Sequence, residues 1–208
     1  MDTRRITALA LILGPVLAMI GYILFDAIAL NGVGPNDPQK FIAELGANST
    51  SVKYTFLGVT VLFLCGIGAL GVIKNSMEGG SGHYIAGFGF FLLIIGSAGQ
   101  LGETALTIAT AEAAHNANMA VASSMFAGSQ AIGAVTTAIS MIGFALIGVG
   151  ILQQKNFSPI IGGLMIVTGI FTSVISAVDY ESQLIGIGFL GISLSFVCLG
   201  VSLLTKKD

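Results

Sequence analysis

Six uninterrupted apolar segments, each about 20 residues or longer, limit the possible folds of this sequence more than any other feature. They cover approximately residues 6–30, 54–73, 84–110, 129–152, 159–178 and 183–204. A helix that crosses a bilayer needs about 20 mostly apolar residues, whereas the strands of a membrane barrel alternate in polarity over about ten. The sequence therefore predicts a single all-α domain over residues 1–208, an integral membrane bundle of six transmembrane helices.

The composition excludes the main classes of soluble protein. Charged residues make up 9% of the chain and hydrophobic residues 54%, whereas soluble domains carry about 25% charged residues. So few charges cannot cover a water-soluble globule, and they leave no basic surface for nucleic acid. We therefore expect contact with the lipid bilayer and no nucleic-acid partner. The 29 glycines favour close helix packing, within the chain and against partner membrane subunits or further copies of it.

The basic residues predict the orientation of the bundle. Where loops are short, lysine and arginine accumulate on the cytoplasmic side of a membrane protein. One side of the predicted bundle carries Arg4, Arg5, Lys74, Lys155, Lys206 and Lys207. The other side carries only Lys40 and Lys53. This bias places both termini in the cytoplasm of a multi-pass plasma-membrane protein.

A short external helix is predicted between the first two spans. Asp37 followed by Pro38 is typical of an N-cap with proline at the first helical position. The helix PQKFIAELG then ends at Gly46, and its apolar side chains share one face. Such an amphipathic helix is expected to lie on the outer surface of the bundle.

A second polar segment, from Glu112 to Met125, is rich in alanine and polar enough to leave the hydrocarbon. We expect it to extend the third spanning helix outward, to turn near His115 and Asn116, and to re-enter as the fourth.

Two carboxylates, Asp26 and Glu103, fall inside the apolar spans. No lysine or arginine lies in any span to pair with them, and an ionised group inside the bilayer costs about 2.5–3.5 kcal/mol on insertion scales. Each carboxylate must therefore be protonated, bind a cation, face water or hydrogen-bond to neighbours. For Asp26, a position at the end of its span, within reach of headgroup water, is the alternative.

Polar and small residues form one stripe on each of four predicted helices, because residues three or four apart share a helix face. In the first span Tyr22 lies beside Asp26. The other stripes are Gly96, Gln100, Glu103 and Thr107; Ser129, Gly133, Thr136 and Ser140; and Thr168, Thr172, Ser176 and Asp179. If the stripes converge, they form an acidic pocket open to the outside, with Asp179, Tyr180, Glu181, Glu112 and His115 around its mouth. Hydroxyl groups that only bond to the preceding turn of their own helix are the structural alternative.

No catalytic pattern is present. The sequence lacks a nucleophile elbow, a P-loop and a zinc-protease motif, so we expect neither an enzyme nor a bound cofactor. His115 and Glu112, three residues apart on one helix, are a candidate metal pair that Met119 could complete for copper. A single histidine with one carboxylate supplies fewer ligands than the three or four of a typical protein metal site.

These features favour a non-catalytic membrane protein with an acidic, outward-facing polar pocket, acting as an accessory subunit or as a module that binds a cation or small ligand. The candidate binding residues are Tyr22, Asp26, Gln100, Glu103, Thr172 and Asp179. The alternative is a proton- or cation-coupled carrier of a small solute that uses Glu103 and Asp26.

Several stretches resemble one family of proteins. They are ALILGPVLAMIGYIL in the first span, FIAELGANSTSVKYTFLGVTVL leading into the second, HNANMAVASSMFAG before the fourth, and YESQLIGIGFLGISLSFVCLG in the last. Together they are similar to domain-of-unknown-function family 998, a family of prokaryotic six-span membrane proteins. The resemblance implies the six-helix architecture and brings no established activity with it.

Overall fold

The structure, a computed structural model, describes residues 3–205. Over this range the chain forms seven helices and no strand. They are α1 (Thr3–Ala29), α2 (Pro38–Ala47), α3 (Ser49–Asn75), α4 (His83–His115), α5 (Met119–Gln154), α6 (Pro159–Val178) and α7 (Leu184–Thr205). All except α2 are long and apolar enough to cross a membrane, which confirms that the six predicted apolar segments form long helices.

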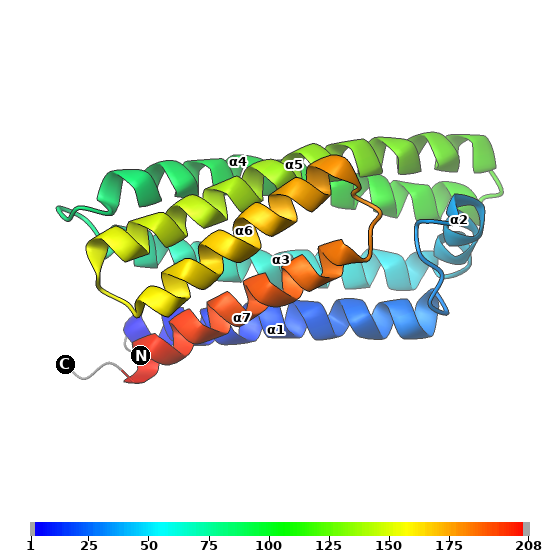
Figure 1. Cartoon of the computed structure of the whole chain (residues 1–208). Helices are drawn as coiled ribbons and strands as arrows, with labels where there is room; N and C mark the ends of the chain where they lie inside the picture. Colours follow the sequence, from blue (N-terminus) through cyan, green and yellow to red (C-terminus); the bar gives the residue numbers. More distant parts are fainter. Residues whose placement is uncertain (1–2, 206–208) are drawn as a thin grey trace.

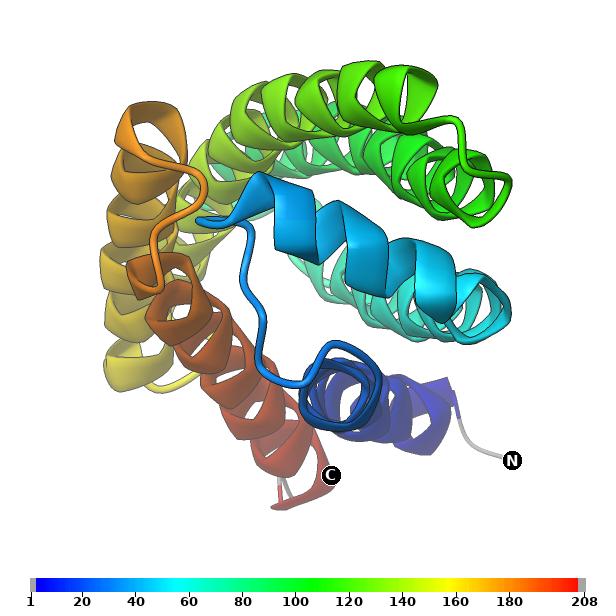
Figure 2. The same ribbon diagram turned by 90° about the vertical axis from the view of Figure 1, so that its right-hand side faces the viewer.

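The six long helices form a closed ring in sequence order. Each packs beside the next long helix, and α7 completes the ring against α1, as the end-on view in Figure 2 shows. At one end of the ring, Arg4 Nε donates a hydrogen bond of 2.6 Å to the carbonyl oxygen of Leu203 and so joins α1 to α7. The other end is crossed by α2 (Figures 1 and 2).

The short helix α2 forms as its capping residues predict. The Asp37 side chain accepts a hydrogen bond of 3.4 Å from the backbone N–H of Lys40, and Pro38 occupies the first helical position. Phe41, Ile42 and Leu45 are buried, because this apolar face of α2 packs mainly on α4. The amphipathic pattern therefore identified the buried face correctly.

The helices of the ring differ greatly in length. α4 and α5 contain 33 and 36 residues, whereas α6 and α7 contain 20 and 22. At about 1.5 Å per residue, α5 is roughly 54 Å long and α6 roughly 30 Å. The hairpin of α4 and α5 consequently extends beyond α6 and α7 at the end where α2 lies (Figure 1). The turn between them begins after His115, as expected, and the polar segment after Glu112 continues both helices past the apolar spans.

Basic residues gather at the end of the ring opposite α2. Within residues 3–205, Arg4, Arg5, Lys74 and Lys155 lie at that end, and Lys40 and Lys53 lie at the α2 end. Lys206 and Lys207, which the sequence analysis assigned to the same side as Arg4, lie outside the described residues.

Two apolar clusters fill the ring at different heights. The basal cluster, near the chain ends, includes Leu11, Leu70 and the stacked rings of Phe144 and Phe196, whose centroids are 5.6 Å apart. The α2 cluster lies beneath α2 and includes Phe25, Phe41, Leu45, Ala111 and Phe126. Between the levels of these clusters a few polar side chains form a polar layer in the bundle: Tyr22 on α1, Thr60 on α3, Gln100, Glu103 and Thr104 on α4, and Thr137 on α5.

Close helix contacts depend on glycine, as the sequence analysis expected. At the crossing of α4 and α5, a Cβ atom added to Gly89 would lie 2.6 Å from the carbonyl oxygen of Gly143 and 2.9 Å from the backbone nitrogen of Ile147. Only hydrogen at these positions lets the two backbones approach so closely. The crossing therefore fixes the relative position of α4 and α5, the helices that carry most of the polar layer.

Candidate functional site

A carboxylate and a phenol form the centre of the polar layer. Tyr180, in the connection between α6 and α7, donates a hydrogen bond of 2.8 Å from its hydroxyl to Glu103 Oε1 on α4. A hydrogen bond to an ionised carboxylate is roughly twice as strong as one between neutral groups. This pair joins two segments that are 77 residues apart in sequence.

Two further side chains extend the network from Tyr180. The hydroxyl of Thr137 on α5 points to the Tyr180 oxygen at the longer distance of 3.5 Å. Gln100, one turn before Glu103 on α4, donates from Nε2 to Thr137 Oγ1 at 3.2 Å. The donors therefore run in one direction, from the amide through two hydroxyls, and end on the Glu103 carboxylate. We call Gln100, Glu103, Gly133, Thr137 and Tyr180 the Glu103 site.

Gly133 on α5 provides the space for the central pair. A Cβ atom at this position would lie 2.5 Å from Cε1 of Tyr180 and 2.6 Å from Oε1 of Glu103. The phenol ring and the carboxylate both rest against this one glycine. The third predicted stripe included Gly133, but it did not indicate this spacing role or the two partners.

No cation balances the Glu103 carboxylate within residues 3–205. Ion pairs in this part of the chain include Lys40 with Asp37 and Lys53 with Glu112, and neither involves Glu103. Glu103 is only partly buried, and among the described residues its second carboxylate oxygen has no hydrogen-bond donor. One oxygen is thus held by Tyr180, and the other is available to a proton, a cation or water.

The stripe of α1 faces the same region. The Tyr22 phenol lies within electrostatic range of the carboxyl groups of Asp26 and Glu103 and of the Tyr180 phenol. Half of the Tyr22 surface is accessible, at 50%, and its ring packs edge-on against Phe56 with centroids 6.3 Å apart. The Asp26 carboxylate is partly buried. The structure therefore brings Tyr22, Gln100 and Glu103 to one region and places Asp26 at its edge, next to Tyr22.

The candidates on α6 lie apart from this network. The Thr172 hydroxyl donates to the carbonyl oxygen of Thr168 at 2.7 Å, and the buried side chain packs against Gly188 on α7. Ser176 in the same stripe donates to the carbonyl oxygen of Ala134 on α5 at 2.8 Å. Asp179 is exposed at the C-terminal end of α6. Thr172 and Ser176 of this stripe therefore contribute to the packing of α6 against α7 and α5.

The candidate metal pair on α4 is divided between two neighbours. His115 Nδ1 donates a hydrogen bond of 3.2 Å to the carbonyl oxygen of Gly46 on α2, whereas Glu112 Oε1 lies 3.7 Å from Lys53 Nζ on α3. Among residues 3–205, no group of three or more histidine, cysteine, aspartate or glutamate side chains is placed to hold a metal ion.

Thr137 is the member of the Glu103 site that sequence reasoning missed. The predicted stripe contained its neighbour Thr136, whose hydroxyl bonds to the carbonyl oxygen of Ile132 in its own helix at 2.8 Å. Residues three and four positions after Gly133 lie on almost the same face. Helix periodicity therefore could not decide between Thr136 and Thr137, and only the rotation of α5 against α4 did.

Burial raises the pKa of the Tyr180 phenol well above its ordinary value, and the negative charge of Glu103 adds to this effect. The phenol therefore remains a donor at neutral pH. Because its pKa is higher in the folded protein than the value of about 10 in an unfolded chain, the folded state gains stability below about pH 10 that disappears as the pH rises through the folded pKa.

Tyr180→Phe removes one tyrosine from the absorbance titration of the protein. We expect the tyrosinate signal that disappears in this variant to be one that forms only clearly above pH ~10. Spectrophotometric titration of the wild-type protein and the variant in detergent measures this difference. A lost transition at or below that pH would contradict the buried hydrogen bond between Tyr180 and Glu103.

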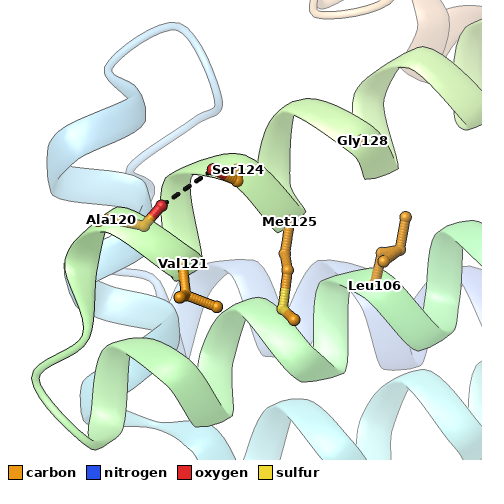
Figure 3. A pocket seen from close by; sticks show the side chains of 6 residues that line it. All are labelled: Leu106, Ala120, Val121, Ser124, Met125 and Gly128. Atoms are coloured by element: carbon orange, nitrogen blue, oxygen red, sulfur yellow. Dashed lines mark hydrogen bonds between the residues drawn. The ribbon is translucent and has the colours of Figure 1, made fainter.

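Two surface grooves lie outside the Glu103 site. One, of about 420 Å³, runs between α4 and α5 near their connecting turn and is lined by Leu106, Ala120, Val121, Ser124, Met125 and Gly128 (Figure 3). The Ser124 hydroxyl there donates to the carbonyl oxygen of Ala120 at 3.1 Å. The other, of about 440 Å³, lies between α1 and α3 and has mainly apolar walls. Neither contains a carboxylate.

Comparison with known proteins adds no relationship: no family model, curated protein or solved structure matches this chain.

Proposed function

We propose that this chain is a non-catalytic, multi-pass protein of the plasma membrane that binds a proton or a small cation at Glu103. The observation that carries the proposal is a partly buried carboxylate inside the bundle with one oxygen held by Tyr180 and no cationic partner within residues 3–205. An ionisable residue inside a membrane domain is costly and is retained mainly for function. A single carboxylate with one free oxygen suits a monovalent ligand better than a divalent metal, which needs more ligands.

We propose that the site opens toward the outside of the cell. Its opening would lie near the C-terminal ends of α1 and α6, close to Asp26 and Tyr180. Both of those ends point to the side of the bundle where α2 lies. The excess of basic residues at the opposite end supports this orientation, with both termini in the cytoplasm.

Cysteine labelling tests the orientation. In a background with Cys65 and Cys198 replaced by serine, we expect a membrane-impermeant thiol reagent to label Asn36→Cys in intact cells. Ser81→Cys, in the connection between α3 and α4, should react only after permeabilisation. Both residues are exposed. The opposite pattern would place the α2 end in the cytoplasm and contradict the outward-facing site.

We also infer membership of domain-of-unknown-function family 998. The resemblance of the first, second, fourth and last spans and the presence of six apolar helices support it.

The binding proposal itself predicts that proton or monovalent cation concentration changes the stability of the purified protein through Glu103. A ligand that binds only the folded state stabilises it by about 2.7 kcal/mol at 100 times its dissociation constant. Thermal unfolding in detergent, over a range of pH and of sodium, potassium and ammonium concentrations, measures this effect.

A further inference from the structure

The connection between α6 and α7 reaches into the bundle at the Glu103 site. It comprises residues 179–183, and α6 and α7 are the two shortest of the spanning helices. The connection therefore lies well short of the turn between α4 and α5 (Figure 1). This position brings Tyr180 to Glu103 from the side of the bundle where α2 lies.

Apart from its backbone bonds to the adjoining ends of α6 and α7, Tyr180 makes the only hydrogen bonds of this connection to other parts of the bundle within residues 3–205. The other hydrogen bonds of the connection are local. Within the turn, Ser182 N–H donates to the carbonyl oxygen of Asp179 at 3.2 Å, and Leu184 N–H donates to Ser182 Oγ at 3.3 Å. The neighbours Asp179 and Gln183 are exposed. Release of one side chain would thus free the connection from the site while its own turn stays intact.

The ring and the hydroxyl of Tyr180 cover Glu103 together. The hydroxyl occupies Oε1 of the carboxylate at 2.8 Å, and the ring packs against Gly133 on the opposite helix. A cation that approaches the carboxylate competes with the phenol, because both are attracted by the same negative charge. Ligand binding would therefore shift this segment from a closed to an open arrangement.

We propose that Tyr180 is the gate of the Glu103 site, with the connection between α6 and α7 acting as a lid that the phenol holds closed. The inference rests on the proposed function, since it describes how access to the same carboxylate is controlled. In the closed state the hydroxyl bonds to Oε1 of Glu103 and the ring restricts access to the carboxylate, so that only its second oxygen can be reached. In the open state the phenol leaves Gly133 and both carboxylate oxygens face the ligand.

Modification of Glu103 by a water-soluble carbodiimide with glycine ethyl ester tests the gate. The rate is measured on the full-length protein in detergent by mass spectrometry of the peptide that contains Glu103. We expect slow modification in the wild-type protein, at least tenfold faster modification in Tyr180→Ala, and an intermediate rate in Tyr180→Phe. Glu78, exposed in the connection between α3 and α4, is the internal reference and should react equally in all forms.

Tyr54→Ala is the matched control, because Tyr54 is 70% exposed and lies on α3, outside the Glu103 site. It should leave the rate at Glu103 unchanged. Tyr180→Phe keeps the ring in place, so it decides the question even if Tyr180→Ala fails to fold.

The outcomes separate the two proposals. Equal and rapid modification of Glu103 in the wild-type protein and both Tyr180 variants would overturn the gate and leave an open binding site. Absence of modification in every folded variant would show that water does not reach Glu103, and would overturn the proposed function as well.

Discussion

Glu103→Gln is expected to remove most of the effect of protons or cations on the stability of this protein and to leave the fold intact. Glutamine has nearly the same shape, and its side-chain oxygen still accepts the hydrogen bond from Tyr180 that the carboxylate accepts at 2.8 Å. It carries no charge, so a cation loses its only strong attraction to the site. We expect binding to weaken about 100-fold, which corresponds to about 2.7 kcal/mol.

Thermal unfolding with each cation, together with calorimetric titration, measures the loss. The variant itself should be at least as stable as the wild-type protein, because it removes a partly buried charge that has no counter-ion among the described residues. Glu112→Gln is the matched control: Glu112 is exposed and paired with Lys53 at 3.7 Å, and its loss should change neither binding nor stability by more than about 1 kcal/mol.

An unchanged response to every cation and to pH in Glu103→Gln would refute the binding site. If the chain is instead a carrier, the same variant loses proton- or ion-dependent uptake, and uptake that persists would exclude that alternative.

Gly89→Ala is expected to destabilise the bundle by about 1–3 kcal/mol, the usual cost of inserting a methyl group into a packed contact. The added Cβ atom would meet the Gly143 carbonyl oxygen at 2.6 Å and the Ile147 nitrogen at 2.9 Å. Both are backbone atoms, which cannot rotate away, so α4 and α5 must separate. Because these helices carry Gln100, Glu103 and Thr137, cation binding should weaken as well.

Gly68→Ala is the matched control for Gly89→Ala, and we expect it not to destabilise the protein. Gly68 also lies in the middle of a long helix, but outside the adjacent backbone of that helix no atom lies within 4 Å of the added Cβ. Alanine is favoured over glycine in a helix interior by about 1 kcal/mol in soluble hosts, so this variant should be neutral or slightly stabilising. Chemical or thermal unfolding of both variants in the same detergent measures the difference. Equal effects would mean that helix propensity, and not the close crossing, determines the result.

Local signals in the sequence were sufficient for the elements of the fold. Lengths of apolar sequence predicted the six spanning helices, and Asp37 with Pro38 predicted the start of α2. The polar segment after Glu112 predicted the turn after His115. These features depend on neighbours in the chain, since the apolar length of a span and the capping of a helix end are local properties.

Side-chain contacts between different helices could not be predicted from such local signals. Glu103 was singled out from its charge and its apolar surroundings, and Gln100 from its place on the same helix face. Nothing near Tyr180 in the chain indicated that its hydroxyl would bond to a residue 77 positions away. Thr172 had the same polar spacing as Gln100, yet its hydroxyl bonds within α6 at 2.7 Å.

The sequence by itself determined that this chain forms six helices long and apolar enough to cross a membrane, and that an acid without a countercharge lies within one of these apolar segments. Those properties follow from the cost of exposing polar groups to hydrocarbon, which acts on each segment separately. The tertiary structure alone decided that Tyr180 covers this acid and that Gly133 leaves room for both. Helix rotation and helix length, set by close contacts such as that of Gly89 with Gly143, bring these distant residues together.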